Sequence, residues 1–278
     1  MSYRTLVVHL DTSLRAHPRL ELAITLARQF GAHLTGVFAL YTPNPRSLDV
    51  MSGASGYFEA HQQLRAERRG ALERLFHAEL KRAQVPGEWL ATDQSAALAM
   101  PQLARCADLI IAGQDDPQDP EAYVGDNFTA NLVLSAGRPV LLVPYAGSVA
   151  ATGTHVMVGW DGSREAARAV HDALPFMRSA TRVTVVTVHG AHRDAAARIP
   201  AADMAMAIAR HGVHVETRDV TVDSEASIGD TLLSEAAGLG ADLLVMGGYG
   251  RTRWQELVLG GATRTVMQSM TLPVLLSH

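Results

Sequence analysis

The sequence predicts an α/β protein made of two tandem domains, each with a five-stranded parallel sheet flanked by helices. The length of 278 residues suits two domains of ordinary size, and the 47% of apolar residues can fill two cores. Along the chain, short β-branched runs alternate with longer segments rich in Ala, Leu and Arg. Strands that are apolar on both faces need helices to cover them, so this alternation favours a doubly wound parallel sheet.

A comparison of the chain with itself indicates a duplication. Three pairs of segments recur in the same order, namely Thr5–Ser13 with His155–Ser163, Ala107–Gly113 with Ala241–Gly247, and Pro139–Val143 with Pro273–Ser277. Each half is too long for a solenoid repeat, which favours duplicated domains. The Ala-, Gly-, Ser- and Thr-rich stretch Ala146–Thr154 is interpreted as a linker, so the domains are expected at residues 1–146 and 154–278.

In the first half, strands are expected at Thr5–Leu10 and Leu109–Ala112, with the longest helices at Arg19–Phe30 and Glu59–Gln84. A loop rich in Pro, Ser and Gly, Tyr41–Tyr57, is inserted after the second strand. In the second half, strands are expected at Val156–Val158, Val183–Val188, Val213–Val220, Leu243–Met246 and Val274–Leu276. The helices between them are expected at Arg164–Met177, Arg193–His211, Ile228–Leu239 and Ala262–Met270.

Composition excludes several classes of function. A net charge of −4 gives no electrostatic reason to bind nucleic acid or an anionic membrane. Apolar runs last only a few residues, so a membrane helix is not expected. The chain enters a strand at once, so a secretory signal is not expected either, and we expect a cytoplasmic location. The single lysine, Lys81, follows no glycine loop, which excludes a Walker-type P-loop. The single cysteine, Cys106, excludes a disulfide framework and is expected to be a buried structural thiol.

The glycine-rich segment after the fourth strand of the second half carries the strongest functional pattern. Gly247 and Gly250 follow that strand, and Gly260 and Gly261 open the next helix. In open parallel sheets, ligands bind beyond the carboxyl ends of the strands, and glycine lets the main chain approach them closely. A helix N-terminus adds unpaired N–H groups that favour an anion. The pattern therefore predicts a phosphate held mostly by main chain.

The spacing Gly-x2-Gly-x9-Gly, followed by a small residue and then a Pro-Val-Leu-Leu strand, resembles that of the nucleotide-binding universal stress proteins. The turn Val-Gly-Trp-Asp161-Gly-Ser163 resembles them too, and the likeness extends over both halves. It implies a Rossmann-like (adenine nucleotide alpha hydrolase-like) fold and a cytoplasmic protein with a sensing or regulatory role in the stress response. It also implies ATP, or related ADP or AMP, in the second half, with Mg²⁺ accompanying a triphosphate.

Carried over residue by residue, the resemblance places the nucleoside near Asp161, the base beside Val188 and the phosphates at the glycine loop. The expected binding residues are Asp161, Gly162, Ser163, Val188, Met246, Gly247, Gly248, Gly250, Gly260, Gly261, Ala262 and Thr263. The family dimerises through its final strand, so the two Pro-Val-Leu-Leu strands are expected to pair within the chain as an intramolecular pseudo-dimer. Further association into a homodimer stays open, and the protein partner is unknown.

Two departures from the pattern affect the expected site. Gly261 stands where the family usually has Ser or Thr, which removes a hydroxyl worth about 0.5–1.5 kcal/mol, and Thr263 is a candidate substitute. In the first half, acidic residues stand where the phosphate loop should be, namely Asp115, Asp116, Asp119 and Glu121. Carboxylates repel phosphates unless a cation intervenes. The first half is therefore expected to have a structural role, with one nucleotide per chain.

Simpler interpretations stay open beside these. The glycines can merely shape a turn, Asp161 can cap a helix, and Arg251, Arg253 and Arg264 can be solvated surface. The pairs His189/His192 and His211/His214 are best explained as surface residues, because no Cys or Glu completes a metal site. No nucleophile and base are assembled, so any ATP hydrolysis is expected to be slow. The alternative function is a dimerisation or interaction module that binds no nucleotide.

Overall fold

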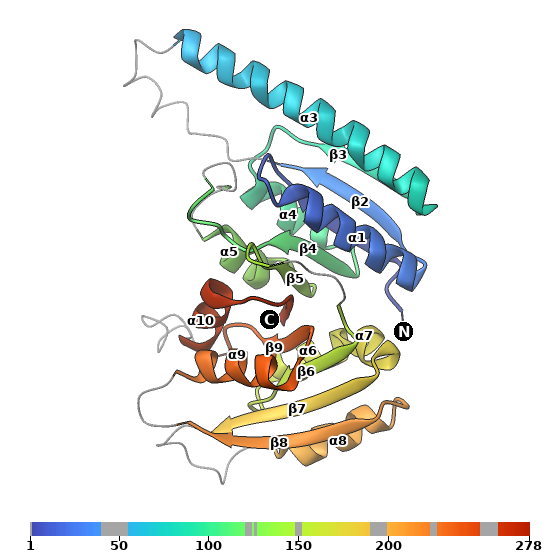
Figure 1. Ribbon diagram of the computed structural model, residues 1–278, viewed down its shortest axis with the longest axis vertical. Coiled ribbons are helices and arrows are strands. Elements are labelled where there is room, and N and C mark those ends of the chain that lie inside the picture. Colours follow the sequence, from blue (N-terminus) through green and yellow to red (C-terminus); the bar gives the residue numbers. More distant parts are fainter. Residues whose placement is uncertain are drawn as a thin grey trace. The chain divides into compact units, whose positions relative to one another are not determined.

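The computed structural model describes residues 2–39, 55–119, 124, 127–147, 152–189, 199–222, 227–250 and 261–278. The chain divides into two compact units, which we call the first unit (Tyr3–Leu132) and the second unit (Val133–His278 with Met1–Ser2). In each unit, strands and helices alternate along the chain (Figure 1). The α/β class predicted from the sequence is thereby confirmed.

The first unit has a parallel sheet in the order β3-β2-β1-β4. Its strands are β1 (Thr5–Leu10), β2 (His33–Phe38), β3 (Gly87–Ala91) and β4 (Leu109–Gly113). Its helices are α1 (Ala16–Phe30), α3 (Ser55–Ala83) and α4 (Ala96–Ala104), and α5 (Phe128–Ser135) spans the division between the units. β1 lies between β2 and β4, so the strand order reverses at β1 and ligands are expected near its carboxyl end.

The second unit has a sheet in the order β5-β10-β9-β6-β7-β8, parallel except for β5. Its strands are β5 (Val140–Val143), β6 (His155–Gly159), β7 (Arg182–His189), β8 (Val215–Thr221), β9 (Leu243–Gly247) and β10 (Val274–Ser277). Its helices are α6 (Arg164–Asp172), α7 (Leu174–Ser179), α8 (Ala201–Ala209), α9 (Ile228–Leu239) and α10 (Gly261–Ser269). Here the strand order reverses at β6, between β7 and β9.

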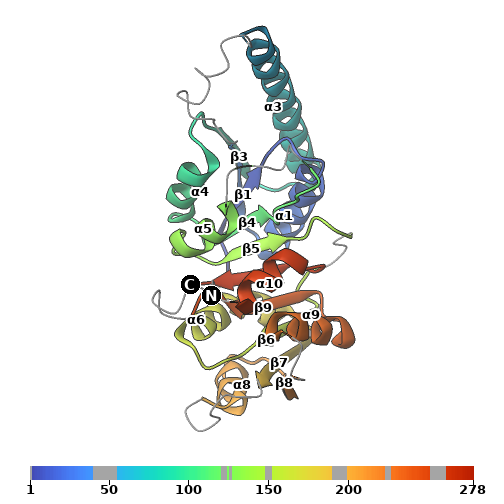
Figure 2. The same ribbon diagram turned by 90° about the vertical axis from the view of Figure 1, so that its left-hand side faces the viewer.

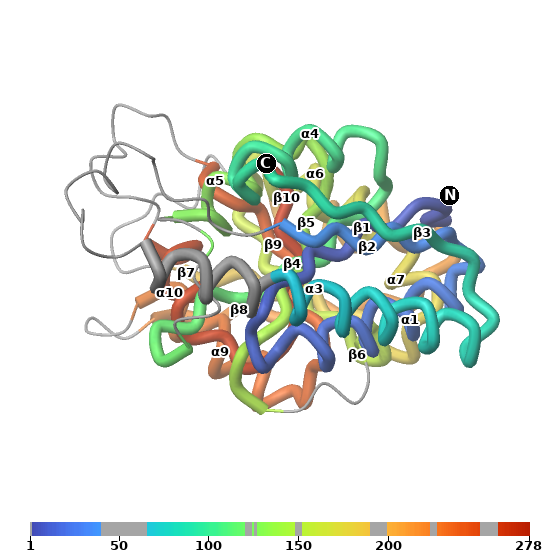
Figure 3. Tube along the Cα trace, turned by 90° about the horizontal axis from the view of Figure 1, so that it is seen from above, coloured from blue at the N-terminus to red at the C-terminus, as the bar shows by residue number. Residues whose placement is uncertain are grey.

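Helices cover both faces of each sheet. In the first unit, α1 and α3 lie on one face and α4 lies on the other (Figures 2 and 3). In the second unit, α9 and α10 share one face while α6 and α8 lie on the opposite face (Figure 2). The central strands are buried along almost their whole length, as in β6 and β9, because helices shield them from water on both sides.

β5 pairs antiparallel with β10, with Leu141 opposite Leu275. These are the two Pro-Val-Leu-Leu strands of the sequence repeat, and their expected pairing within the chain is present. β5 lies in the first half of the sequence (residues 1–146) but belongs to the second compact unit, which therefore starts earlier in the chain than the linker. Both strands are fully apolar in their pairing segments, so their side chains add to one core.

The structure differs from the predicted elements at three places. The helix expected at Arg164–Met177 is two helices, α6 and α7, which meet at Ala173 because Pro175 lacks the N–H group that a continuous helix needs. α8 begins at Ala201, directly after Pro200, and residues 190–198 lie outside the described residues. Cys106 is exposed rather than buried, because it lies in the turn after α4 and not inside that helix.

The loop expected at Tyr41–Tyr57 falls mostly outside the described residues, although α3 begins at Ser55. Within the described residues, none of the helices is both long and apolar enough to cross a membrane.

An aspartate before the fourth strand of each half explains one of the repeated motifs. Asp242 accepts hydrogen bonds from the N–H groups of Gly153, Thr154 and His155, at 2.9–3.1 Å. Asp108 likewise accepts from the N–H group of Arg4 at 2.7 Å and from the N–H group of Thr5 at 3.0 Å. Each carboxylate therefore joins the start of one strand to the start of its neighbour, β6 to β9 and β1 to β4.

Substitution of Asp242 by Ala should lower the free energy of unfolding by about 1.5–3 kcal/mol, because N–H groups at the start of β6 lose a charged acceptor. Urea denaturation followed by circular dichroism measures this. The control is Asp203→Ala, which removes an exposed carboxylate from the first turn of α8 and should cost under about 1 kcal/mol. Equal losses in the two variants would contradict the structural role of Asp242.

Candidate functional site

Three segments of the second unit meet where the strand order reverses. They are the turn after β6 (residues 160–163), the turn after β9 (247–250) and the N-terminus of α10. β6 and β9 are adjacent and end together, with Gly159 opposite Met246. The meeting point is the carboxyl edge of a parallel sheet, where the backbone of a βα turn is free to face a ligand.

The turn after β6 is held by its own side chains. Asp161 Oδ1 accepts from the N–H group of Ser163 at 3.0 Å, and Ser163 Oγ accepts from the N–H group of Ala166 at 3.1 Å. Ser163 is therefore the N-cap of α6, a role that the sequence analysis considered for Asp161. Asp161 itself is exposed beside the cap, and Gly162 takes a left-handed φ of 76°.

The turn after β9 packs directly against the start of α6. A Cβ atom on Gly247 would lie 2.5 Å from the backbone N of Ala166, closer than real Cβ contacts. A Cβ atom on Gly250 would lie 2.8 Å from Glu165 Oε2 and 3.4 Å from Ser163 Oγ. Gly247 therefore needs to be glycine because it approaches the backbone of α6, whereas the sequence pattern predicted a close approach of these glycines to a ligand, which stays a prediction.

The N-terminus of α10 lies beside the same turn. Thr263 is buried and its Oγ1 accepts from the N–H group of Tyr249 at 3.3 Å, so this hydroxyl oxygen holds the turn in place. Tyr249 takes a left-handed φ of 56°, and its hydroxyl donates to the sulfur of Met267 at 3.4 Å. Gly261 is exposed, and a Cβ atom there would meet nothing within 4 Å.

The other expected binding residues are distributed as follows. Met246 in β9 and Val188 in β7 are buried, Gly248 is buried, and Ala262 is half-buried. Gly248 donates its N–H group to Ser277 O at 2.8 Å, so it links β9 to β10. Arg264 is exposed on α10. Gly260 lies outside the described residues, as do Arg251 and Arg253.

Glu165 is a residue at this site that sequence reasoning missed. Its side chain is 3% exposed, and its Oε1 accepts from Nε of Arg164, which is 87% exposed. Within the described residues, Glu165 Oε2 is buried and has no hydrogen-bond partner. From the sequence, an acidic residue in the first turn of a helix is explained by the helix dipole alone, so nothing indicated that it would be buried beside the glycine turn.

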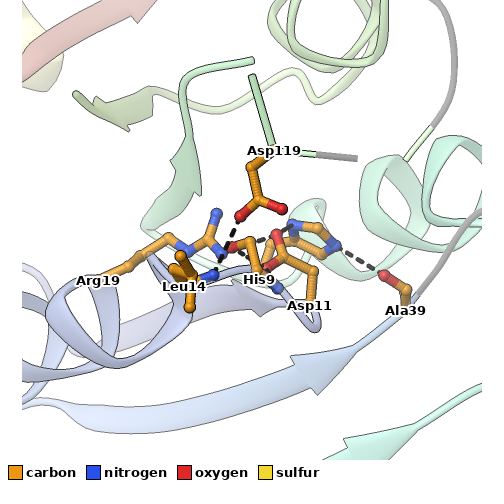
Figure 4. A network of polar contacts seen from close by, with 7 residues as sticks. His9, Asp11, Leu14, Arg19, Ala39 and Asp119 are labelled. Carbon is orange, nitrogen blue, oxygen red and sulfur yellow. Dashed lines mark hydrogen bonds and ion pairs between the residues drawn. The ribbon is translucent and has the colours of Figure 1, made fainter. Parts of the chain in front are cut away.

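The corresponding place in the first unit is filled by the chain's own side chains. Asp11 is buried and pairs with the buried Arg19, whose Nη2 lies 2.7 Å from Asp11 Oδ2 (Figure 4). A Cβ atom on Gly113 would lie 2.1 Å from Arg19 Nη1, so the guanidinium covers the end of β4. In the sequence repeat, Arg19 corresponds to Ala169, which is why the second unit has no such pair.

The acidic residues of the first half are also engaged. Asp119 Oδ2 accepts from the N–H group of Leu14 at 3.1 Å, as Figure 4 shows. Asp115 Oδ2 accepts from the Thr129 hydroxyl at 2.9 Å, and burial raises the pKa of Asp115. Asp116 Oδ1 accepts from the N–H group of Gln118 at 2.9 Å. Glu121 lies outside the described residues. Carboxylates thus bind N–H and O–H groups where the other half has its glycine turn.

The buried network sets the charges of its members. Burial alone would raise the pKa of Asp11, but Arg19, His9 and Ser13 together lower it below its usual value. His9 Nε2 lies 2.8 Å from the carbonyl oxygen of Ala39 and therefore carries the proton. Burial lowers the pKa of His9 from 6.5 to about 4, so the imidazole is neutral at pH 7. In the described residues, His9 Nδ1 and Arg19 Nε have no hydrogen-bond partner.

The histidines that were expected at the surface form no metal site in the described residues, where no group of three or more His, Cys, Asp or Glu could hold an ion. His189 Nε2 lies 2.9 Å from Asp219 Oδ1 at the ends of β7 and β8. The ring of His211 packs edge-on against His171, with centroids 6.5 Å apart. His192 lies outside the described residues.

Comparison with known proteins gives one family. A model of the universal stress protein family matches residues 2–144 and 153–278. A universal stress protein from Archaeoglobus fulgidus DSM 4304 has 16% sequence identity and a TM-score of 0.67, covering 98% of this chain and 95% of that chain. A functionally unknown protein from Pseudomonas aeruginosa PAO1 has 14% identity and a TM-score of 0.58, covering 99% and 92%.

A universal stress protein in complex with cAMP has 25% identity but a TM-score of only 0.35, covering 45% of this chain and 97% of that chain. No curated protein matches the sequence. The two full-length likenesses show a shared fold.

Substitution of Arg19 by Ala should lower the free energy of unfolding by about 3–5 kcal/mol, because it leaves the buried Asp11 carboxylate without its cation. A second substitution, Asp11→Ala, should recover part of this loss. Urea denaturation measures both. The control is Arg82→Ala, which breaks an exposed ion pair with Glu79 and should leave the stability almost unchanged. A small loss in the Arg19 variant would show that the pair does not stabilise the fold.

His9 should make the protein less stable in acid. Because the pKa of His9 is lower in the folded chain than its usual value of 6.5, the unfolded chain takes up the proton first as the pH falls. The stabilisation is complete above pH 6.5 and declines towards pH 4, by roughly 3 kcal/mol in all. Denaturation at a series of pH values should show a flatter decline for His9→Gln than for the unchanged protein. Parallel curves would mean that His9 does not contribute.

Proposed function

The chain belongs to the universal stress protein family, and from this membership we propose that its second half binds ATP or a related adenine nucleotide. The nucleotide would serve a sensing or regulatory role in the stress response of the cytoplasm. The proposal concerns binding rather than catalysis.

The observation that carries the proposal is the convergence of two backbone turns and a helix N-terminus at the carboxyl edge of the second unit. Gly247 comes so close to the backbone of α6 that no side chain fits there, and Gly250 lies against the side chain of Glu165. Gly261 presents an exposed start to α10, where unpaired N–H groups favour an anion. A phosphate held by main chain suits this arrangement, and the neighbouring Asp161 is exposed towards solvent for a sugar hydroxyl.

The first half supports a stoichiometry of one nucleotide per chain. Arg19 covers the end of β4, and Asp119 accepts the N–H group of Leu14 that would otherwise face an anion. Internal groups of opposite charge therefore satisfy the positions that a nucleotide would use. We assign this half a structural role.

The alternative function is an interaction module of the same fold that binds no nucleotide. Gly261, which lacks the hydroxyl of the family pattern, favours this alternative. Thr263 is buried against the turn, where its oxygen accepts from the N–H group of Tyr249 while its O–H group can still donate. The pairing of β5 with β10 serves either function, because it requires no ligand.

Substitutions at position 261 can either strengthen or weaken nucleotide binding, because a side chain fits there without a clash. Gly261→Ser should restore the missing hydroxyl and tighten the binding of Mg-ATP by roughly two- to tenfold, as one hydrogen bond of about 0.5–1.5 kcal/mol predicts. Gly261→Asp should weaken binding by at least tenfold, because a carboxylate at the start of α10 repels phosphate while favouring the helix itself. Isothermal titration calorimetry on the full chain measures both affinities.

The outcomes separate the two functions. One site per chain, tightened by Ser and weakened by Asp, supports nucleotide binding in the second half. Two sites per chain would contradict the structural role of the first half. No heat from the unchanged protein and from Gly261→Ser at millimolar Mg-ATP would favour the interaction module.

A further inference from the structure

Glu165 brings a buried negative charge to the glycine turn. It is the second residue of α6 and is 3% exposed, and only its Oε1 is paired, with the exposed Arg164. Its Oε2 is buried and has no partner in the part of the chain that the structure describes. A buried carboxylate oxygen without a donor costs free energy, so its presence points to a missing partner.

The unpaired oxygen faces the turn rather than the core. The space beside Gly250 is bounded by Glu165 Oε2 and by Ser163 Oγ, which would lie 2.8 Å and 3.4 Å from a Cβ atom at that position. Gly250 itself is exposed. The carboxylate therefore borders the surface at which the main chain of the turn meets solvent.

A phosphate at this surface would lie close to the carboxylate, and two anions in one site repel each other. The usual remedy in phosphate-binding loops is a lysine, but the single lysine of the chain, Lys81, belongs to α3 in the first unit. Arg164 is already paired with Oε1, and Arg264 is exposed on α10. Among the described residues, the remaining way to combine this carboxylate with a phosphate is a cation between them; Arg251 and Arg253 lie outside the described residues.

We propose that Glu165 holds a divalent cation together with the phosphate oxygens of the nucleotide, so that binding in the second half requires the cation; the inference rests on the proposed function. Mg²⁺ prefers hard oxygen ligands and is usually held by one or two carboxylates, substrate phosphates and water. The donor set at Glu165 fits this preference. Because no cluster of three or more potential ligands occurs in the described residues, the cation binds with the nucleotide and not before it.

Calorimetric titrations of the full chain test this with three additions: MgCl2 alone, ATP in EDTA, and ATP with excess MgCl2. The unchanged protein should give no heat with MgCl2 alone and should bind Mg-ATP at least about tenfold tighter than metal-free ATP, the factor expected from one charge-assisted contact. Glu165→Gln should bind metal-free ATP more tightly than the unchanged protein does, and its preference for Mg-ATP should fall below about threefold. Glu216→Gln, which removes an exposed carboxylate from β8, is the matched control and should behave like the unchanged protein.

Two results would overturn the role of Glu165 while leaving nucleotide binding intact. One is equal affinity of the unchanged protein for ATP with and without Mg²⁺, and the other is an unchanged Mg²⁺ preference in Glu165→Gln. Absence of binding by the unchanged protein, Glu165→Gln and Gly261→Ser under every condition would instead overturn the proposed function.

If Glu165→Gln does not fold, pulsed electron paramagnetic resonance of Mn-ATP bound to unchanged protein with 13C-labelled glutamate decides the matter. A coupling between Mn²⁺ and a glutamate carboxyl carbon is expected. Its absence from the bound complex would overturn the assignment.

Discussion

The close approach of the β9 turn to the first turn of α6 is the constraint on which the candidate site depends. A Cβ atom on Gly247 would come within 2.5 Å of the Ala166 backbone, so the two segments can meet only through main-chain atoms. The pairing of β6 with β9 fixes the ends of both strands, and Asp242 fixes their starts. The sheet thereby holds the turn after β6 and the turn after β9 in contact, and the N-terminus of α10 lies beside the turn after β9.

The two halves show what the same backbone does with different side chains. Eight residues after the first aspartate, one half has Arg19 and the other has Ala169. The arginine reaches back to Asp11 and covers Gly113, so the first unit pairs its buried carboxylate with a cation of its own. The alanine cannot reach, and Asp161 is left exposed beside the turn.

The fold was largely predictable from the sequence, whereas the site was predictable only in its glycines. Apolar runs and repeats predicted the elements, and α9 was expected at its observed bounds, where the structure has a serine N-cap and a glycine C-cap. The break at Ala173 was missed because periodicity continues across Pro175. The burial of Arg19 and Glu165 was missed for another reason, since a charged residue on a helix is usually solvated and only tertiary contacts reveal an exception.

A ligand site and a stable core make opposite demands on the same buried charges. In the first unit, the Asp11 carboxylate accepts from Arg19 and Ser13, and both donors belong to the chain, so nothing from outside is needed. In the second unit, Glu165 Oε2 lacks a donor among the described residues, which costs stability unless a bound group supplies one. A chain with two copies of a domain can carry that cost in one copy while the other pairs its buried carboxylate internally. The paired arrangement of Asp11 with Arg19 was available to the same fold, so the unpaired Glu165 oxygen supports the binding role proposed for it.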